Sequence, residues 1–432
     1  MLSVSIPNVA FGSLLIGGTR NGLYKPKEFH GTGTPIINMG ELFAFARLSI
    51  TPPRRLRVTQ DELTRFAVQP DDLLFARRSL VAEGAGRCCW IRAVAEPTVF
   101  ESSIIRARLN PLIADSAYYF YLFSSQVGRD LMSSILRQVA VSGITGTDLV
   151  NLQVPNPPIE TQRAISGLLS ALDDKIELNR RMNETLEAMA RALFRSWFVD
   201  FDPVRAKSEG RPTGLPADLD ALFPSEFEDS PLGEIPKGWS VRPLDEIADF
   251  LNGLALQKFP AVEGEPWLPV IKIAQLRKGI TPDCDRASFG VPPNYIIQNG
   301  DLLFSWSGSL GVQVWTHGQG ALNQHLFKVT SNEFQQWFVY QWLMEHLTHF
   351  RHVAASKATT MGHIQRSHLT GALCVVPDER VLSAANDQVG LLHAQVVQNS
   401  LEAGRLASTR DELLPRLLSG EIEVADVEGR ES

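Results

Sequence analysis

Cysteine is scarce in this chain, which has four cysteines among 432 residues. Cys88 and Cys89 are adjacent, while Cys284 and Cys374 each stand alone, so their spacing fits neither a zinc site nor a disulfide framework. We therefore expect reduced thiols and a cytoplasmic protein. No apolar run reaches the roughly 20 residues that span a membrane. No basic segment precedes the first apolar residues, so we expect no signal peptide.

Patterns of catalytic residues are missing as well. The nine histidines include no HExxH pattern, and the helically spaced His346, His349 and His352 have no counterpart in the first half of the chain. The nearest approach to a glycine-rich cofactor loop is residues 82–86, and the similar residues 307–311 predict a turn that both halves share. We expect no metal, no cofactor and no catalytic residues.

One short string resembles catalytic machinery. Residues 156–159 read Asn-Pro-Pro-Ile and resemble the Asn-Pro-Pro-aromatic loop of amino-methyltransferases, but Ile replaces the aromatic residue. The string also stands where a long helix needs its start, which is the interpretation that we favour. Asp71, Asp72 and Asp301 precede Leu-Leu-Phe runs, where a turn or capping role is sufficient. They do not form the paired carboxylates of a nuclease.

Excess positive charge is also lacking, because the net charge is −7. Its distribution is uneven. Residues 1–158 carry 16 Lys/Arg against 12 Asp/Glu, and residues 236–383 carry 12 of each. The acidic excess lies in residues 201–235 and 384–432, with 8 and 9 Asp/Glu against 3 and 4 Lys/Arg. The two globular regions can therefore present a local basic face to nucleic acid.

Residues 159–198 predict one helix of about 60 Å, since they contain no proline and a single glycine. A second helix is predicted at 383–418. Both carry a seam at seven-residue spacing, formed by Ile165, Leu172, Asn179, Leu186 and Leu193 and by Leu392, Asn399, Leu406 and Leu413. Leu168, Met182 and Met189 predict a second row. We expect the two helices to pair antiparallel, with Asn179 and Asn399 meeting and fixing the register.

The chain repeats itself outside these helices. Asn-Gly-Leu at 21–23 recurs at 252–254, and Val-Gln-Pro-Asp-Asp-Leu-Leu-Phe at 68–75 answers to Ile-Gln-Asn-Gly-Asp-Leu-Leu-Phe at 297–304. Residues 103–106 answer to 325–328 in the same order. The chain is thus two copies of one unit, a globular part followed by a long helix.

These signals predict an α+β (mixed α/β) fold with two repeated domains joined by two long antiparallel coiled-coil helices. Residues 68–75 and 297–305 are expected to form strands, and residues 116–136 and 333–352 helices. The expected segments are a first domain at 1–155, a helix at 156–201, an acidic Pro/Gly linker at 202–235, a second domain at 236–381, a helix at 382–420 and an acidic tail at 421–432.

Basic and polar loop residues differ between the copies, whereas the core residues repeat. Lys and Arg bind phosphates, and Arg, Gln and Asn read base edges. This pattern is what two readers of different sequences on one scaffold would show. The predicted DNA-binding residues are Lys25, Arg54, Arg55, Arg57, Arg77, Arg78, Ser79, Lys258, Lys272, Gln275, Arg277, Lys278, Ser305, Trp306 and Ser307.

The chain resembles the specificity (S) subunits of type I restriction-modification enzymes over nearly its whole length. The resemblance is sharpest in residues 155–202, with Glu-Thr-Gln at 160–162, Leu-Ser-Ala-Leu-Asp-Asp-Lys-Ile at 169–176 and Trp-Phe-Val-Asp-Phe-Asp at 197–202. The Gly-Glu-Ile-Pro-Lys-Gly-Trp string at 233–239 is also typical. The second helix departs from the pattern, because it contains Gly390, Gly404 and Pro415 and lacks the Asn-Arg and Ser-Trp-Phe signatures.

The resemblance implies a non-catalytic protein with two target recognition domains, each reading one part of a split DNA target. It implies two modification (M) subunits, which carry the methyltransferase chemistry and dock on the helices, and restriction (R) subunits that cleave. Two other interpretations remain open. One is an interaction scaffold that joins partners through its coiled coil without reading DNA, and the less favoured one is a self-contained DNA methyltransferase.

Overall fold

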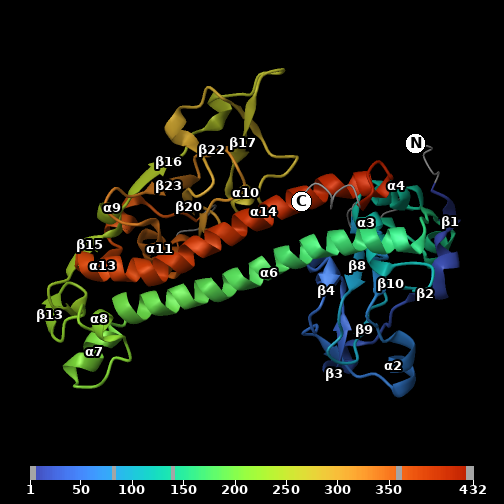
Figure 1. The fold of residues 1–432 in the computed structure, drawn as a ribbon, viewed down its shortest axis with the longest axis horizontal. Coiled ribbons are helices and arrows are strands. Elements are labelled where there is room, and N and C mark those ends of the chain that lie inside the picture. The colour runs from blue at the N-terminus through green and yellow to red at the C-terminus, as the bar shows by residue number, and fades with distance from the viewer. Residues whose placement is uncertain (1–5, 80–83, 138–141, 357–361, 425–432) are drawn as a thin grey trace. The chain divides into compact units, whose positions relative to one another are not determined.

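The computed structural model describes residues 6–79, 84–137, 142–356 and 362–424 (Figure 1). It contains two compact units, the first formed by Met1–Asp174 with Leu406–Ser432 and the second by Lys175–Arg405. The finer division into six segments stays a prediction. Each unit combines small sheets with helices, so the expected α+β class is confirmed.

The first unit is built on a five-stranded sheet in the order β2-β10-β6-β8-β4. β10 lies antiparallel to both β2 and β6, and β4 runs parallel to β8. Phe75, Ile105 and Trp90 place their side chains in its core. The strands are β2 (Leu15–Asn21), β4 (Arg47–Leu48), β6 (Asp72–Ala76), β8 (Cys88–Ile91) and β10 (Ile104–Leu109).

A second, smaller sheet completes this unit, in the order β5-β3-β9, with β3 parallel to β9 and antiparallel to β5. Its strands are β3 (His30–Ile37), β5 (Arg55–Leu56) and β9 (Val99–Phe100). Two short pairs, β1 (Asn8–Ala10) with β12 (Gln153–Pro155) and β7 (Arg78–Ser79) with β11 (Ser142–Gly143), tie the ends together. The helices are α1 (Met39–Ala44), α2 (Gln60–Phe66), α3 (Ser116–Ser124), α4 (Gln126–Ser134) and α5 (Gly146–Asn151).

The second unit repeats most of this plan, with one strand fewer in its main sheet and one more in its smaller sheet. Its main sheet has the order β16-β23-β20-β21, and its smaller sheet has the order β18-β17-β22-β19, with β17 parallel to β22. The strands are β15 (Ser240–Pro243), β16 (Asp249–Asn252), β17 (Trp267–Ile271), β18 (Arg286–Ser288), β19 (Ile296–Ile297), β20 (Leu302–Ser305), β21 (Gly311–Val314), β22 (Gly320–Leu322), β23 (Leu326–Thr330) and β24 (Leu373–Val376). The helices before the long one are α9 (Leu244–Ile247), α10 (Ile273–Lys278), α11 (Gln336–Ser356), α12 (Arg366–Thr370) and α13 (Glu379–Ala385).

The first long helix, α6, spans Ile159–Phe198 without a break. The second is interrupted: α13 continues through a π-helix at Asn386–Gly390 into α14, which spans Leu391–Leu418 and contains Pro415. In the first unit, Ile165 and Leu169 of α6 share a core with Leu417 and Leu418 of α14.

The predicted seam residues are fully or partly buried along both helices, and in the second row Leu168 is partly buried against the core of the first unit, but the two methionines are exposed. Met182 and Met189 are 39% and 49% exposed, and the neighbouring Leu178 is 49% exposed. The expectation that these methionines form a second buried row is therefore wrong. Within the second unit the less exposed residues of α6 lie on the seam with Asn179 and Leu186.

The connector between α6 and the second globular part is packed rather than extended. It contains α7 (Asp202–Ser208), α8 (Ala217–Asp220) and the hairpin of β13 (Phe227–Ser230) and β14 (Gly233–Pro236). Phe201, Val204 and Phe223 are buried in the large core of the second unit. Nothing in the described helices combines the length and apolarity that crossing a bilayer requires.

Candidate nucleic-acid interface

The repeated Asn-Gly-Leu string forms the same backbone contact in both units. Gly22 N donates to Ile104 O and Gly253 N to Leu326 O, both at 3.0 Å. A Cβ on Gly22 would lie 2.1 Å from Glu101 O, and one on Gly253 would lie 2.2 Å from Asn323 O. Only glycine permits this approach, so the string fixes where the chain leaves β2 and β16. We call this contact the glycine clamp.

A second shared feature is the turn before β6 and β20. Asp72 Oδ2 accepts from Gln69 N at 2.8 Å, and Asp301 Oδ2 accepts from Gln298 N at 2.7 Å. Each carboxylate also binds a cation from the neighbouring strand. Arg108 Nε and Nη2 lie 2.6 and 2.8 Å from Asp72, and Lys328 Nζ lies 2.7 Å from Asp301. The aspartates thus have the turn role expected from the sequence.

A third correspondence marks the far ends of these two strands. Ile144 N donates to Arg77 O and Ile364 N donates to Trp306 O, each at 3.0 Å. Arg77 and Trp306 therefore occupy equivalent backbone positions although their side chains have opposite character. We call the glycine clamp, the aspartate turn and this strand-end contact together the frame. The two units share the frame, whereas the side chains that the frame presents differ.

Two of the predicted first-unit residues gather around one aromatic ring. The Lys25 ammonium lies 4.6 Å and the Arg57 guanidinium 5.7 Å from the Phe29 ring centroid. Lys25 Nζ also pairs with Glu62 at 2.7 Å, and this hydrogen bond lowers the pKa of Glu62. Lys27, in the same turn, is exposed. We call Lys25, Lys27, Phe29 and Arg57 the Phe29 cluster.

The other first-unit residues lie on two different edges. Arg54 is exposed beside β5, while Arg55 donates to both oxygens of Glu96 at 2.7 and 3.1 Å, and this hydrogen bond lowers the pKa of Glu96. Arg77 Nη1 reaches Ser102 O at 3.4 Å. Arg78 is exposed on β7, with Ser79 next to it.

In the second unit, four predicted residues belong to one helix and its N-cap. Lys272 is the N-cap of α10 and pairs with Asp285, and its N–H donates to Gln275 Oε1 at 3.3 Å. Arg277 and Lys278 are exposed in the last turn of α10. Lys258 is exposed at the end of the 3-10 helix Leu256–Lys258, which follows the glycine clamp.

Ser305 and Ser307 are buried, and both hydroxyls are used inside the unit. Ser305 Oγ donates to Ser309 O at 2.6 Å and accepts from Gly311 N at 2.9 Å, so it closes the Gly-rich turn. Ser307 Oγ lies 3.0 Å from His325 Nδ1. Neither serine hydroxyl is therefore available to contact DNA. The turn expected at 82–86 in the first copy falls partly outside the described residues.

Trp306 is partly buried and holds its neighbours in place. Its Nε1 donates to Asn252 Oδ1 at 3.0 Å, and its ring lies 5.8 Å from Phe327 and 6.1 Å from His325. Sequence reasoning did not single out His325 and Asn252, the partners of Trp306. A signal was present for His325, because the repeat has Ser103 at this position of the first copy, whereas Asn252 is identical to Asn21.

A polar layer joins α6 and α14 within the second unit. Asn179 Nδ2 lies 3.4 Å from Asn399 O, and Asn399 Nδ2 donates to Asn183 Oδ1 at 2.9 Å. Asn183 Nδ2 in turn donates to Ser400 Oγ at 2.9 Å. Asn179 and Asn399 are 1% and 4% exposed. Such a buried polar layer matches in only one register of two helices.

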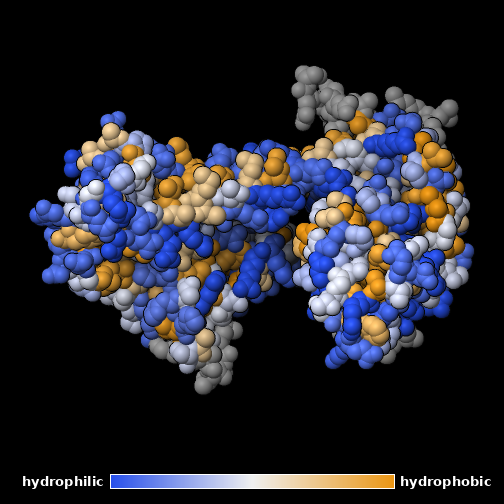
Figure 2. Space-filling model, turned by 90° about the horizontal axis from the view of Figure 1, so that it is seen from below, coloured by the Kyte–Doolittle hydropathy of each residue, from blue (hydrophilic) through white to orange (hydrophobic). Residues whose placement is uncertain are grey.

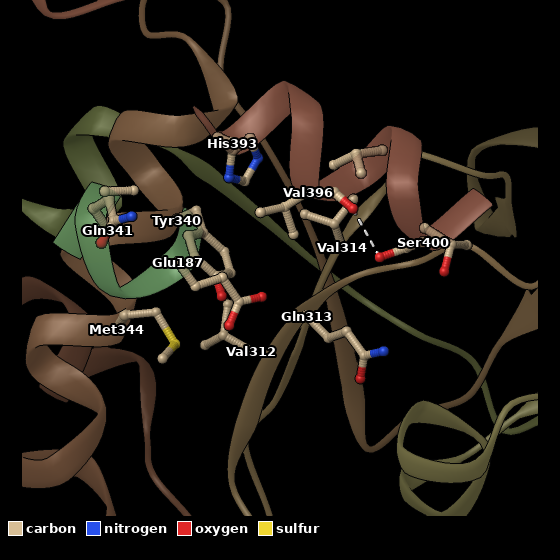
Figure 3. Close-up of a pocket in the computed structure, with 13 residues that line it drawn as sticks. Glu187, Val312, Gln313, Val314, Tyr340, Gln341, Met344, His393, Val396 and Ser400 are labelled. Carbon is tan, nitrogen blue, oxygen red and sulfur yellow. Dashed lines mark hydrogen bonds between the residues drawn. The ribbon is translucent and has the colours of Figure 1, made fainter. Parts of the chain in front are cut away.

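A pocket of about 330 Å³ in the second unit lies between α6, β21, α11 and α14 (Figure 3). Glu187, Val312, Tyr340 and His393 point into it. Burial raises the pKa of Tyr340 to about 12 and lowers that of His393 to about 4, so both are neutral near pH 7. His393 Nε2 and Gln336 Oε1 are 3.2 Å apart. The described residues contain no cluster of three or more His, Cys, Asp or Glu that could hold a metal.

Hydrophobic residues on the face drawn in Figure 2 are interspersed with polar ones. Fold and frame together define a class: duplicated α+β proteins in which one scaffold, repeated within the chain, presents different polar side chains. The chain belongs to the family described as the type I restriction modification DNA specificity domain, which matches residues 21–188 and 236–370. The family expected from the sequence is thereby confirmed.

Individual relatives support this assignment. The chain is 27% identical over 409 residues to the type I restriction enzyme HindI specificity subunit of Haemophilus influenzae, covering 82% of this chain and 87% of the relative. It is 25% identical over 414 residues to the MjaIX specificity subunit of Methanocaldococcus jannaschii, covering 93% and 90%. The crystal structure of a type I restriction-modification S subunit from M. genitalium has the same fold, with a TM-score of 0.59, 16% identity and coverage of 96% and 97%.

Proposed function

We propose that this chain is the non-catalytic specificity subunit of a cytoplasmic type I restriction-modification complex and that each globular part reads one word of a bipartite DNA target. The observation that carries the proposal is the shared frame. The glycine clamp, the aspartate turn and the strand-end contact recur with matching hydrogen bonds, whereas exposed side chains beside them differ. A duplicated frame with different outward residues suits two different words on one duplex.

Basic side chains supply the phosphate contacts in this proposal. The favoured basic residues are Lys25, Arg54, Arg57 and Arg78 in the first unit and Lys258, Lys272, Arg277 and Lys278 in the second, and the neutral Gln275 is the favoured reader of a base edge. Each of these side chains is exposed or partly exposed. Exposed lysines and arginines release counterions from DNA when they bind it, which makes affinity depend steeply on salt.

The long helices are the proposed docking site for two modification subunits, to which restriction subunits add. Leu178, Met182 and Met189 support this assignment, because they give α6 an apolar face that the second unit leaves 39–49% exposed. Apolar residues that recur on one face of a helix favour a protein partner.

Methylome sequencing tests the proposal in cells that carry this chain with its cognate modification subunit, compared with the modification subunit alone. We expect a new methylated motif made of two short words around a fixed gap. A stable complex that adds no methylation would instead favour the scaffold without DNA readout. Labelling of DNA by this chain alone with S-adenosylmethionine would revive the methyltransferase interpretation.

A charge variant sharpens this test. Arg277→Ala combined with Lys278→Ala should weaken DNA binding of the complex and reduce the slope of log affinity against log salt by about 1 for each lost phosphate contact. The matched control is Arg211→Ala with Lys237→Ala, which removes two cations that pair with Glu209 and Glu226 in the connector. Equal effects of the two pairs would exclude a specific role for α10.

A further inference from the structure

One exposed aromatic residue is not accounted for by the basic contact set. Tyr24 is 77% exposed, although tyrosine rings usually bury most of their surface against protein. It lies in the first unit, directly after the glycine clamp. The repeat places Ala255 at the same position of the second unit, where Asn-Gly-Leu is followed by alanine. The frame itself therefore does not require an aromatic residue at this position.

The backbone around Tyr24 is held firmly. Leu23 N donates to Phe100 O at 2.8 Å, and Leu23 packs against the small core of Ile36, Leu56 and Val99. Gly22 cannot move away from Glu101 without breaking the clamp. Tyr24 is therefore presented outward from a fixed point, and a side chain on a fixed backbone loses little conformational entropy when it binds.

Charge around Tyr24 distinguishes between possible partners. The Phe29 cluster lies beside it: Lys25 and Arg57 lie over the Phe29 ring, Lys27 is exposed, and Glu62 pairs with Lys25. An aromatic ring beside lysine and arginine combines an apolar surface, which can contact base edges such as the thymine methyl group, with cations that bind phosphates. A protein partner of ordinary composition would gain less from this combination.

We propose that the ring of Tyr24 contacts DNA bases or sugars in the first word of the target, making it a specificity-determining residue that the second unit lacks. This inference rests on the proposed function. The Phe29 cluster holds the flanking phosphates, and the glycine clamp fixes the depth to which the ring reaches.

The test measures binding of the assembled complex to three duplexes: the full target, the target with its first word scrambled, and the target with its second word scrambled. Tyr24→Ala should weaken binding to the full target about tenfold, the order of one lost contact to a base pair. It should have no effect once the first word is scrambled. Tyr24→Phe keeps the ring and should bind like the wild type. Leu112→Ala is the control, since Leu112 is 79% exposed in the same unit.

Several outcomes would overturn the inference. The complex with Tyr24→Ala could bind all three duplexes as tightly as the wild type, or its affinity could fall equally for all three. The variant could also lose the modification subunit, which would mark Tyr24 as a protein contact. A loss in Tyr24→Phe as large as in Tyr24→Ala would exclude contact through the ring. If the wild-type complex itself does not distinguish the three duplexes, the proposed function fails, independently of Tyr24.

Discussion

The two aspartate turns offer a matched pair of stability experiments within one chain. Asp72→Ala and Asp301→Ala remove the same hydrogen bond to a turn N–H, at 2.8 and 2.7 Å. They differ in what else is lost. The Asp72 side chain is fully buried and pairs with Arg108, whereas the Asp301 side chain is 21% exposed and pairs with Lys328.

Burial sets the expected magnitudes. Removing one partner of a buried ion pair leaves an uncompensated charge and costs about 3–5 kcal/mol, which we expect for Asp72→Ala. Arg106, 4.0 Å from Asp72 and 12% exposed, adds to this cost because it loses its nearest carboxylate. In Asp301→Ala only one cation, Lys328, loses its partner, and the carboxylate that is removed was itself 21% exposed to water, so we expect about 1–2 kcal/mol.

Hydrogen exchange measured by mass spectrometry separates the two units, because peptides from β6 and β20 report on each frame independently. Asp72→Ala should accelerate exchange in β6 and β10 by roughly 200- to 5,000-fold, and Asp301→Ala should accelerate exchange in β20 and β23 by roughly tenfold. Asp72→Asn and Asp301→Asn are milder controls that keep an acceptor oxygen for the turn. Equal accelerations in both units would refute the argument that burial magnifies the first ion pair.

Three further predictions concern the glycine clamp, the polar layer and the pocket histidine. Gly22→Ala should disrupt the first unit, since the new Cβ would lie 2.1 Å from a carbonyl oxygen, whereas Gly40→Ala meets nothing within 4 Å and should leave the melting temperature within a few degrees of the wild type. A double-mutant cycle of Asn183→Ala and Asn399→Ala should give a coupling of about 1 kcal/mol in denaturant unfolding, because these side chains bond directly at 2.9 Å. The same cycle for Asn179 and Asn399 should give a coupling near zero, because Asn179 bonds the Asn399 backbone oxygen; a large value would contradict this geometry. Burial lowers the pKa of His393 to about 4, below its unfolded value of about 6.5, so its contribution to stability is complete above pH 6.5 and is lost as the pH falls toward 4. That loss is at most about 3 kcal/mol, less because the ring is only partly buried, and His393→Gln should flatten the pH dependence of the melting temperature in this range.

Much of the fold could be predicted from sequence because its signals are repeated. The internal repeat predicts a duplicated frame, and the two units share the order of four strands in the main sheet and of three strands in the smaller sheet, with the same parallel pair. Local boundaries were less predictable. Residues 116–136 form two helices instead of one, because the side chain of Ser125 caps α4 at Gly128 N. The strand expected at 68–75 begins only at Asp72, after the aspartate turn.

The candidate site was harder to predict for a physical reason. Residue type says whether a side chain could bind DNA, but not whether its polar atoms are already occupied. Ser305 and Ser307 are suitable residue types whose hydroxyls close internal contacts, and Arg55 already binds Glu96 with two hydrogen bonds. Occupied and available groups look alike in one sequence, because their partners are distant in the chain.

The contacts that hold the frame are separate from the side chains that face outward, and this separation has a consequence for how such a protein can change its target. Two of the three frame contacts, the glycine clamp and the strand-end contact, are main-chain bonds that do not depend on the neighbouring side chains, and the third uses an aspartate that both units have. A substitution beside them, as between Tyr24 and Ala255, alters the outward surface without altering the backbone path. The cost to folding is then small, since a change at an exposed position usually stays within about 0.5 kcal/mol. The two units can therefore diverge in what they present while both keep one fold, and a change confined to one unit should alter one word of the proposed target and leave the other intact.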